Sequence, residues 1–390
     1  MGKTLFVSHS ATRTGAPLLL LNFLRWYKEQ GHTAFVIVLV EGGELEAEFR
    51  AIAETLVWTP PSLPGNDLLS EVKTRARRRR ARRRVVAAIR RHQPDLVYAN
   101  SVASCVFLVE TLGSMPPRTR YVLHVHEGEF VIRTYCNVDA FHAMKDRSTR
   151  IIAASRATSE NLVARHGVNA ERTSVIYEHL DVAAVVAGAA GASRDAIRDE
   201  LAIPADAFVV GGCGLVQIRK GIDIFLATKV VLDQLRPGSN VHFVWVGHVD
   251  DYHRELMRLD LERANLTKTV HFTGERPQPF AYFDAFDVFY LSSREDPFPV
   301  ACLEAAALGK PIIAFRDAGG MPEFIEDDGG TVIPYLDCVA AARAIARYMD
   351  EPDLRAQHGG RARAKANDYD IRVIGPRIAS AIEAVRGASP

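Results

Sequence analysis

Short apolar runs alternate with segments of helical spacing along the whole chain. Uninterrupted apolar runs, such as 288–291 and 311–315, are typical of strands buried on both faces of a sheet. Strands that alternate with helices indicate parallel sheets covered by helices on both sides. In the first half we expect a helix over 16–27 and strands over 4–7, 32–40, 95–99, 120–125, 150–154 and 173–177.

The pattern is interrupted once and then restarts. Residues 187–192 are all alanine or glycine, and a polar helical segment, 193–201, follows before a new strand begins at residue 207. One hydrophobic core rarely organises more than about 250–300 residues, so a chain of 390 residues also favours two domains. The second half is expected to contain strands 207–212, 241–246, 270–272, 288–291 and 311–315 and helices 222–235, 252–264 and 299–308.

We therefore predict an α/β protein with two doubly wound, Rossmann-like domains that face each other across a cleft. The first would span 1–185, a linker 186–205, and the second 206–370, with a final helix, 371–390, that packs back toward the first domain. Ligands of such folds bind at the carboxyl ends of the strands. The loops that follow the strands are therefore where functional residues are expected.

Composition indicates more about the cellular environment of the protein than about its function. The net charge is +1, so only a local patch could attract a charged partner. The cysteines are five in number and lack CxxC spacing, which favours reduced thiols in a cytoplasmic protein. We expect no secretory signal and no membrane span, because no apolar stretch approaches about 18 residues. Any membrane contact would be peripheral.

The most informative segment is 292–310, SSREDPFPVACLEAAALGK, which joins a buried strand to a helix. Asp296 precedes this helix and Glu304 lies within it, so two acceptors for sugar or ribose hydroxyls would stand beside free N–H groups of the helix start. Such a start attracts anions. A simpler interpretation is an acidic helix cap with a solvated glutamate.

Two further loops contain glycines and cations. Gly214 closes a glycine-rich strand end, and Arg219 and Lys220 follow it, a combination that suits a diphosphate. Gly319 and Gly320 follow the strand 311–315, where backbone could approach a ligand closely. The alternatives are a basic surface pair before a helix and an ordinary turn.

The first half offers less specific signals. Gly15 lies between the first strand and the first helix, but neither a GxGxxG fingerprint nor a P-loop is present. His126 closes the strand 120–125 at its carboxyl end and would face the cleft. His124 lies on the same side of that strand. A hydrogen-bonded structural histidine is the alternative interpretation.

These segments together resemble retaining glycosyltransferases of the GT-B fold, glycosyltransferase family 4, also called group 1. The similar motifs are SHSATRTGAP, HVHE, GCGLVQIRKGID, VHFTGE, FDVFYLSSREDPFPVACLEAAALGKPIIAF and AGGMPEFI, in the order of the family. They span most of the chain, and the second half is the more specific. The resemblance assigns the acceptor to the first domain and the nucleotide-sugar donor to the second.

The resemblance also implies roles for single residues. Glu304 would hold the ribose hydroxyls, and Asp296, which replaces the usual first glutamate of the family's pair, would touch the donor sugar together with the backbone of Phe298, Pro299 and Val300. Glu275 lies in the loop 274–276 that would set base specificity.

The remaining roles follow in the same way. Lys220 matches the family's lysine, whereas Leu215 stands where its arginine would be, so Arg219 is inferred to take that role. His126 matches the histidine near the donor sugar, and Gly15 matches the glycine that lets the first helix approach the diphosphate. Gly214, Gly319 and Gly320 complete the expected donor site.

The implied reaction is transfer of a hexosyl group from a nucleotide-diphosphate sugar to a hydroxyl of a glycan, lipid-linked or small-molecule acceptor, with retention, as in polysaccharide biosynthesis. No metal and no cofactor is expected, because cations and helix N-termini would neutralise the diphosphate. Two alternatives stay open: a nucleotide-sugar epimerase of the same fold and a non-catalytic glycan- or nucleotide-sugar-binding protein.

One charge anomaly lies outside these motifs. The segment 73–91, KTRARRRRARRRVVAAIRR, would form a helix that is cationic around most of its circumference. It could be a solvated helix, or Arg75–Arg91 could bind an anionic membrane surface or a lipid-linked acceptor at the inner face of the membrane. Nucleic acid is the least favoured partner, since no nucleic-acid-reading module accompanies the segment.

Overall fold

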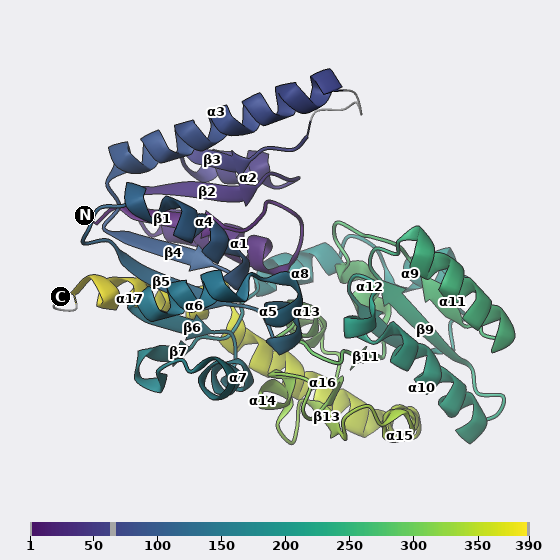
Figure 1. Cartoon of the computed structure of the whole chain (residues 1–390). Coiled ribbons are helices and arrows are strands. Elements are labelled where there is room, and N and C mark those ends of the chain that lie inside the picture. The colour runs from purple at the N-terminus through teal and green to yellow at the C-terminus, as the bar shows by residue number, and fades with distance from the viewer. Residues whose placement is uncertain (1, 63–67, 388–390) are drawn as a thin grey trace. The chain divides into compact units, whose positions relative to one another are not determined.

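The computed structural model describes residues 2–62 and 68–387, and these form two units, each with its own sheet (Figure 1). Unit 1 contains the described residues up to Glu178 and those from Ile371 onward, and unit 2 spans His179–Asp370. Both sheets are parallel throughout, with helices between the strands. This confirms the predicted α/β class with two doubly wound, Rossmann-like sheets.

Unit 1 has a seven-stranded sheet in the order β3-β2-β1-β4-β5-β6-β7. Its strands are β1 Thr4–Ser8, β2 Phe35–Glu41, β3 Thr55–Thr59, β4 Leu96–Asn100, β5 Arg120–Val125, β6 Arg150–Ala153 and β7 Thr173–Val175. Its helices are α1 Gly15–Glu29, α2 Glu46–Ile52, α3 Leu68–His92, α4 Cys105–Thr111, α5 Glu129–Tyr135, α6 Val138–Arg147, α7 Arg156–His166 and α17 Ile371–Gly387.

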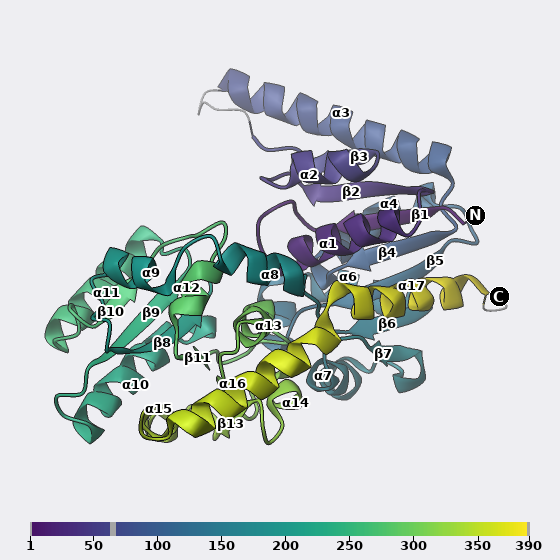
Figure 2. The ribbon, with the colours of Figure 1, turned by 180° about the vertical axis from the view of Figure 1, so that it is seen from behind.

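Alternating side chains of the strands supply two separate cores in unit 1. On β1, Leu5 and Val7 belong to the core under α3, α4 and α6, whereas Phe6 belongs to the core under α1, α2 and α17. Helix α17 packs against α1 (Figure 2), where Gly375 is close to the ring of Trp26. The segment predicted as a final helix thus lies within unit 1, except that residues 388–390 fall outside the described part.

Unit 2 has a six-stranded sheet in the order β10-β9-β8-β11-β12-β13. Its strands are β8 Phe208–Cys213, β9 Val241–Val246, β10 Val270–Phe272, β11 Val288–Leu291, β12 Ile312–Phe315 and β13 Gly330–Ile333. Its helices are α8 Val182–Ala189, α9 Arg194–Glu200, α10 Ile222–Leu235, α11 Asp251–Arg263, α12 Phe280–Ala285, α13 Val300–Ala307, α14 Met321–Ile325, α15 Cys338–Asp350 and α16 Pro352–Ala366.

The residues predicted as a linker, 186–205, form the end of α8 and all of α9 within unit 2. Both helices pack against α12. A methyl group on Gly188 would lie 2.6 Å from Cδ2 of Phe280, so small residues in this run allow close helix packing. The chain passes between the units at Glu178–His179 and again at Asp370–Ile371.

Candidate active site

Apart from Glu275, the predicted donor residues of unit 2 lie in the segments after three neighbouring strands, β8, β11 and β12, or on helix α13. Lys220, in the short 3-10 helix η4 (Ile218–Lys220) after β8, donates from Nζ to Oδ2 of Asp296 in the loop after β11, at 2.5 Å. Arg219 Nη1 lies 4.0 Å from the same oxygen and donates to the carbonyl oxygen of Glu295 at 2.7 Å. The structure therefore brings Lys220, Arg219 and Asp296 together.

Backbone hydrogen bonds hold the loop of Asp296 against the loop that follows β12. The Asp296 N–H donates to the carbonyl of Ala318 at 2.7 Å, and the Gly320 N–H donates to the carbonyl of Pro297 at 2.8 Å. Gly319 has a φ of +139°, and a methyl group there would lie 1.8 Å from the carbonyl oxygen of Asp296. The glycine is therefore required for these two loops to meet.

Glu304 has a different environment from Asp296. Its side chain, on α13, is half-buried and forms no hydrogen bond or ion pair with any residue that the structure describes. Burial raises its pKa to about 7, because desolvation disfavours the charged form. The pKa values of two nearby thiols, Cys213 at the end of β8 and Cys302 in the first turn of α13, are raised mainly by burial and in part by the charge of Glu304. An unpaired carboxyl in such a place can accept hydrogen bonds from ligand hydroxyls.

The loop that starts α13 is fixed by apolar packing. Phe298 is buried, and its ring stacks on Tyr369 with centroids 5.4 Å apart. Pro299 caps the helix in an extended conformation, and Val300 is the first helical residue. The backbone N–H groups of the first turn are thus held at the same end of the sheet as Asp296.

Arg294 holds the loops after β8 and β11 together, and no pattern in the sequence marks it as a site residue. Its N–H donates to the carbonyl of Arg219 at 2.8 Å. Its guanidinium binds both carboxylate oxygens of Asp223, at 2.9 and 2.7 Å. Gly214, with a φ of +138°, lies against the aliphatic part of the Lys220 side chain. Together these contacts orient Lys220.

Glu275 is separated from this cluster. It is exposed in the loop after β10, the edge strand of the sheet, and no interaction within the described residues links it to Lys220, Asp296 or Glu304. Its predicted part in base specificity stays a prediction.

In unit 1, Gly15 is the first residue of α1, and a methyl group on it would meet no atom within 4 Å. Packing within the unit therefore does not explain the glycine. Asn100, the last residue of β4, donates from Nδ2 to the neighbouring carbonyl of Ala16 at 2.7 Å. Its Oδ1 lies 3.0 Å from Nε2 of His126, so the start of α1 is connected to the predicted histidine.

His126 directly follows β5, and its imidazole is buried. Its Nδ1 lies 2.6 Å from Oε1 of Glu178, whose side chain is also buried. Burial lowers the pKa of His126, but the charge and hydrogen bond of Glu178, together with the charge of Glu127, outweigh burial, and the pKa is raised. The prediction had treated His126 alone and missed Glu178, since a single acidic residue after a short strand carries no signal in the sequence.

Two other residues complete this polar network. Glu127 accepts the backbone N–H groups of His126 and Val102, at 2.9 and 3.2 Å, and the hydroxyl of Ser101. Ser101 has a φ of +144°, which is rare for a residue other than glycine, and strained backbone of this kind is concentrated at functional sites. His124 binds the hydroxyl of Tyr98 through Nδ1 at 2.5 Å.

His124, His126 and Glu178 offer atoms that lie within 4.8 Å of one another, a spacing that a metal ion would need. The Nδ1 atoms of both histidines and Oε1 of Glu178 are, however, engaged in the hydrogen bonds described above. We therefore treat the group as a hydrogen-bonded network.

Comparison with known proteins places both units in one family. Residues 207–351 match the family model described as glycosyl transferases group 1, and residues 13–184 match the model described as glycosyltransferase family 4. The two matches cover most of both units.

Individual relatives agree with these models. The chain is 33% identical over 159 residues to the lipopolysaccharide core biosynthesis glycosyltransferase LpsD of Rhizobium meliloti (strain 1021), covering 40% of this chain and 44% of the relative. It is 31% identical over 189 residues to a D-inositol 3-phosphate glycosyltransferase of Saccharomonospora viridis, covering 46% and 43%. The matching part thus spans less than half the length of these curated relatives.

A solved structure extends the similarity to the whole chain at the level of the fold. Anabaena Alr3699/HepE, crystallised with UDP-glucose, superposes with a TM-score of 0.77 at 22% identity, over 98% of this chain and 99% of HepE. With a model of the same family matched in each unit, the chain belongs to glycosyltransferase family 4, the group 1 glycosyl transferases, and has the GT-B fold.

Proposed function

We propose that the protein is a retaining hexosyltransferase that moves a sugar from a UDP-sugar to a hydroxyl of a glycan, glycolipid or small-molecule acceptor, without a metal ion. The observation that carries the proposal is the cluster in unit 2, where Lys220 and Arg219 flank Asp296 while Glu304 stays unpaired nearby. Cations beside free acceptors suit a diphosphate bearing hydroxyl-rich groups. The complexes of HepE with UDP and UDP-glucose support UDP as the nucleotide.

The proposed step breaks the bond between the anomeric carbon and the β-phosphate oxygen. The acceptor oxygen bonds to the anomeric carbon, and its hydroxyl proton passes to the departing phosphate oxygen. Negative charge then develops on the departing phosphate. Lys220 and Arg219 would stabilise it, as would the N–H groups at the start of α13. Asp296 is held by Lys220 and accepts hydrogen bonds from the sugar, so we assign it no covalent role. Glu304 would accept the ribose hydroxyls.

Product analysis tests this proposal. UDP-, GDP-, ADP- and TDP-sugars are first screened by thermal shift, since a ligand that binds the folded state stabilises it. The donor selected is then incubated with candidate acceptors. We expect a UDP-sugar to be selected and a glycosylated product to form. Lys220→Ala and Glu304→Ala should abolish transfer with the fold intact, whereas Lys268→Ala, an exposed lysine in the same unit, should not. Normal turnover by both site variants would refute the site.

The two alternatives give different products. An epimerase would convert the donor in the absence of any acceptor, and a binding protein would show a thermal shift but no turnover. Hydrolysis or transfer of the donor sugar excludes the binding protein, and a strict need for acceptor excludes the epimerase.

We also propose that α3 binds an anionic membrane surface at the inner face of the membrane. The residues of α3 include ten arginines and one lysine against one glutamate, a net charge of +10, which leaves −9 for the rest of the chain. Val85 and Ile89 are buried on the sheet side, next to β3 (Figure 1). The outward side is almost entirely cationic. Every described helix is too short or too polar to cross a bilayer, so contact would be peripheral.

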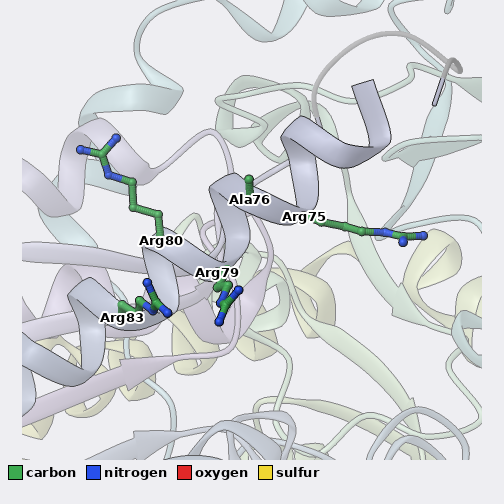
Figure 3. Close-up of a pocket in the computed structure, with 5 residues that line it drawn as sticks. All are labelled: Arg75, Ala76, Arg79, Arg80 and Arg83. Atoms are coloured by element: carbon green, nitrogen blue, oxygen red, sulfur yellow. The ribbon is translucent and has the colours of Figure 1, made fainter. Parts of the chain in front are cut away.

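Some arginines of the outward side lack counter-charges, although Arg75 pairs with Glu71 at 3.6 Å and Arg82 with Glu110 at 3.5 Å. Figure 3 shows Arg75, Arg79, Arg80 and Arg83 extending from α3. Arg79, Arg80 and Arg83 form no ion pair with residues that the structure describes. No aromatic side chain stands among them to stack on bases, which disfavours single-stranded nucleic acid. The relative LpsD is named a lipopolysaccharide core biosynthesis glycosyltransferase, and this name supports a membrane partner for the present chain.

Vesicle flotation tests the membrane proposal. We expect binding to phosphatidylcholine vesicles that contain phosphatidylglycerol and none to phosphatidylcholine alone. Replacing Arg79, Arg80 and Arg83 by glutamine should weaken binding roughly 100-fold, at about 1 kcal/mol per arginine. The matched control replaces Arg254, Arg258 and Arg263 of α11 by glutamine and should bind normally. Equal binding of both variants, or binding to RNA but not to vesicles, would refute it.

A further inference from the structure

We propose that Glu178 is the positioning residue of His126: its carboxylate fixes the imidazole ring and holds a hydrogen on Nδ1, so that Nε2 is always a donor toward the ligand. The expected effect on catalysis rests on the proposed glycosyl transfer, whereas the protonation of the ring can be measured without it. The geometry that carries the proposal is the pair of contacts that His126 makes with Glu178 and Asn100.

Both ring nitrogens of His126 face acceptors. The Ala16 carbonyl can only accept, so the amide nitrogen of Asn100 must face it, and Oδ1 of Asn100 must face Nε2 of His126. Nδ1 faces the Glu178 carboxylate. Beside an ionised Glu178, a neutral imidazole carries only one N–H and would leave one of these contacts as two acceptors facing each other. The two contacts therefore need two hydrogens, one on Nε2 and one between Nδ1 and the Glu178 carboxylate.

The second oxygen of Glu178 indicates where the extra proton resides. Oε2 is buried and has no hydrogen-bond partner in the described part of the chain. A hydroxyl at that oxygen would be a buried donor without an acceptor, which is costly. The proton is thus retained between Oε1 and Nδ1. Imidazole is ordinarily the stronger base of the two groups, so we assign the proton to Nδ1 and the pair as an imidazolium with a carboxylate.

Three other titratable groups lie near His126: Glu127, His124 and His9. Glu127, beside it on the chain, favours the charged ring, as Glu178 does. His124 lies with its ring centroid 4.0 Å away. His9, after β1, has a lowered pKa, chiefly because of burial and partly because of His126. Burial opposes the charge on His126, and Glu178, which makes the direct contact, is the largest of the causes that favour it.

A ring held in this way supplies one defined hydrogen-bond donor. A sugar or phosphate oxygen can replace Oδ1 of Asn100 at Nε2 without any change of tautomer. Without the carboxylate, the ring loses its second proton as the pH rises, and Nε2 can become an acceptor that repels the same oxygen. Glu178 would then affect catalysis only through His126, without touching the substrate itself.

NMR of ring-labelled histidines in the full chain tests the proposal, with the His126 signals assigned from their loss in His126→Gln. We expect wild-type His126 to stay mostly doubly protonated at pH 6.5, the ordinary pKa of histidine, and Glu178→Gln to lower its titration midpoint by at least one pH unit. The matched control is Glu129→Gln, because Glu129 binds His166 at 2.8 Å in the same unit. That variant should alter His166 and leave His126 unchanged. A neutral wild-type His126 at pH 6.5 would overturn the proposal even if Glu178→Gln fails to fold.

The pH dependence of transfer gives the second readout. If the doubly protonated ring is needed, activity falls as the pH rises through the His126 pKa, and Glu178→Gln should move this fall to lower pH, with partial rescue in Glu178→Asp. A uniform loss of activity with an unchanged pH profile would contradict a positioning role. If no sugar is transferred by any form while the NMR result holds, the proposed function fails and the role of Glu178 in charging His126 stands.

Discussion

Replacing Glu304 by glutamine should stabilise the free protein at alkaline pH while it weakens donor binding. Burial raises the pKa of Glu304 from 4.5 to about 7. In the unfolded chain this carboxyl ionises near 4.5, so the folded state retains a proton that the unfolded state has lost, and stability falls as the pH rises from 4.5 to 7. At about 1.4 kcal/mol per pKa unit, the ionised carboxyl costs the folded state about 3 kcal/mol above pH 7.

Urea unfolding at two pH values measures this cost. Trp245 is buried in the core of unit 2, and with Trp26 and Trp58 replaced by phenylalanine its fluorescence reports on that unit alone. We expect Glu304→Gln to gain about 2.5 kcal/mol relative to the parent between pH 5 and pH 8. The control Glu262→Gln, an exposed carboxylate of α11, should show no comparable gain. An equal difference at both pH values, or a loss at pH 8, would refute the reasoning.

The same carboxyl should make donor binding depend on pH. Ligand hydroxyls favour the ionised form, which is scarce below pH 7, so the affinity for UDP-glucose should fall about tenfold between pH 8 and pH 6. UDP-glucose has no phosphate that titrates in this range, which makes it a better probe than UDP. Calorimetry of Glu304→Gln should show weak binding without this dependence. A pH-independent wild-type affinity would contradict the assigned role of Glu304.

Three further predictions concern other residues. Lys220→Ala should lower kcat by a factor of about 100–1,000, the effect of losing one preorganised donor worth about 2.7–4 kcal/mol, and steady-state kinetics would contradict it by showing a change in KM alone. Gly15→Ala should leave the melting temperature unchanged, because the added methyl group meets no atom within 4 Å, but should raise KM for the donor; unchanged kinetics would remove Gly15 from the site. The pKa of His271 is lowered to about 4, first by burial and then by His242, so unit 2 should lose up to about 3 kcal/mol of stability as the pH falls from 6.5 to 4. Urea titrations of His271→Gln should show a smaller loss, and an identical loss would refute the assignment.

The fold could be predicted because short apolar runs, each typical of a strand, alternate with helical segments along the whole chain. The predicted bounds of the strands at 120–125, 241–246, 270–272 and 288–291 match the structure. The edge strands β3 and β13 were missed, although the edge strands β7 and β10 were predicted, so position at the sheet edge alone does not explain the difference. The alanine and glycine run near residue 190 was interpreted as a linker, since composition alone cannot distinguish flexibility from close helix packing.

The site could be predicted only in part. Lys220 and Asp296 lie in the segments that follow central strands, and Glu304 lies on the helix after one of those segments, so position in the fold selects all three. Arg294 and Glu178 were missed because their importance arises from contacts with residues 71 and 52 positions away. Ionised side chains are common on surfaces, so only burial and a partner distinguish these two. Neither property can be read from a single sequence.

The two units hold their polar residues by different means, and this determines which variants can be interpreted. In unit 2, backbone bonds such as that from Asp296 to Ala318 fix the loops together with the side chains of Arg219 and Arg294, so the Lys220 side chain can be changed without releasing the chain. In unit 1, side chains form the hydrogen bonds that the backbone groups of these loops need. Glu127 accepts hydrogen bonds from two backbone N–H groups, and the amide of Asn100 donates to the carbonyl of Ala16. Replacing either therefore alters structure and chemistry together. Among the described contacts, the hydrogen bond of the Glu178 side chain is to His126 alone, so its replacement changes the histidine and leaves the backbone bonds intact.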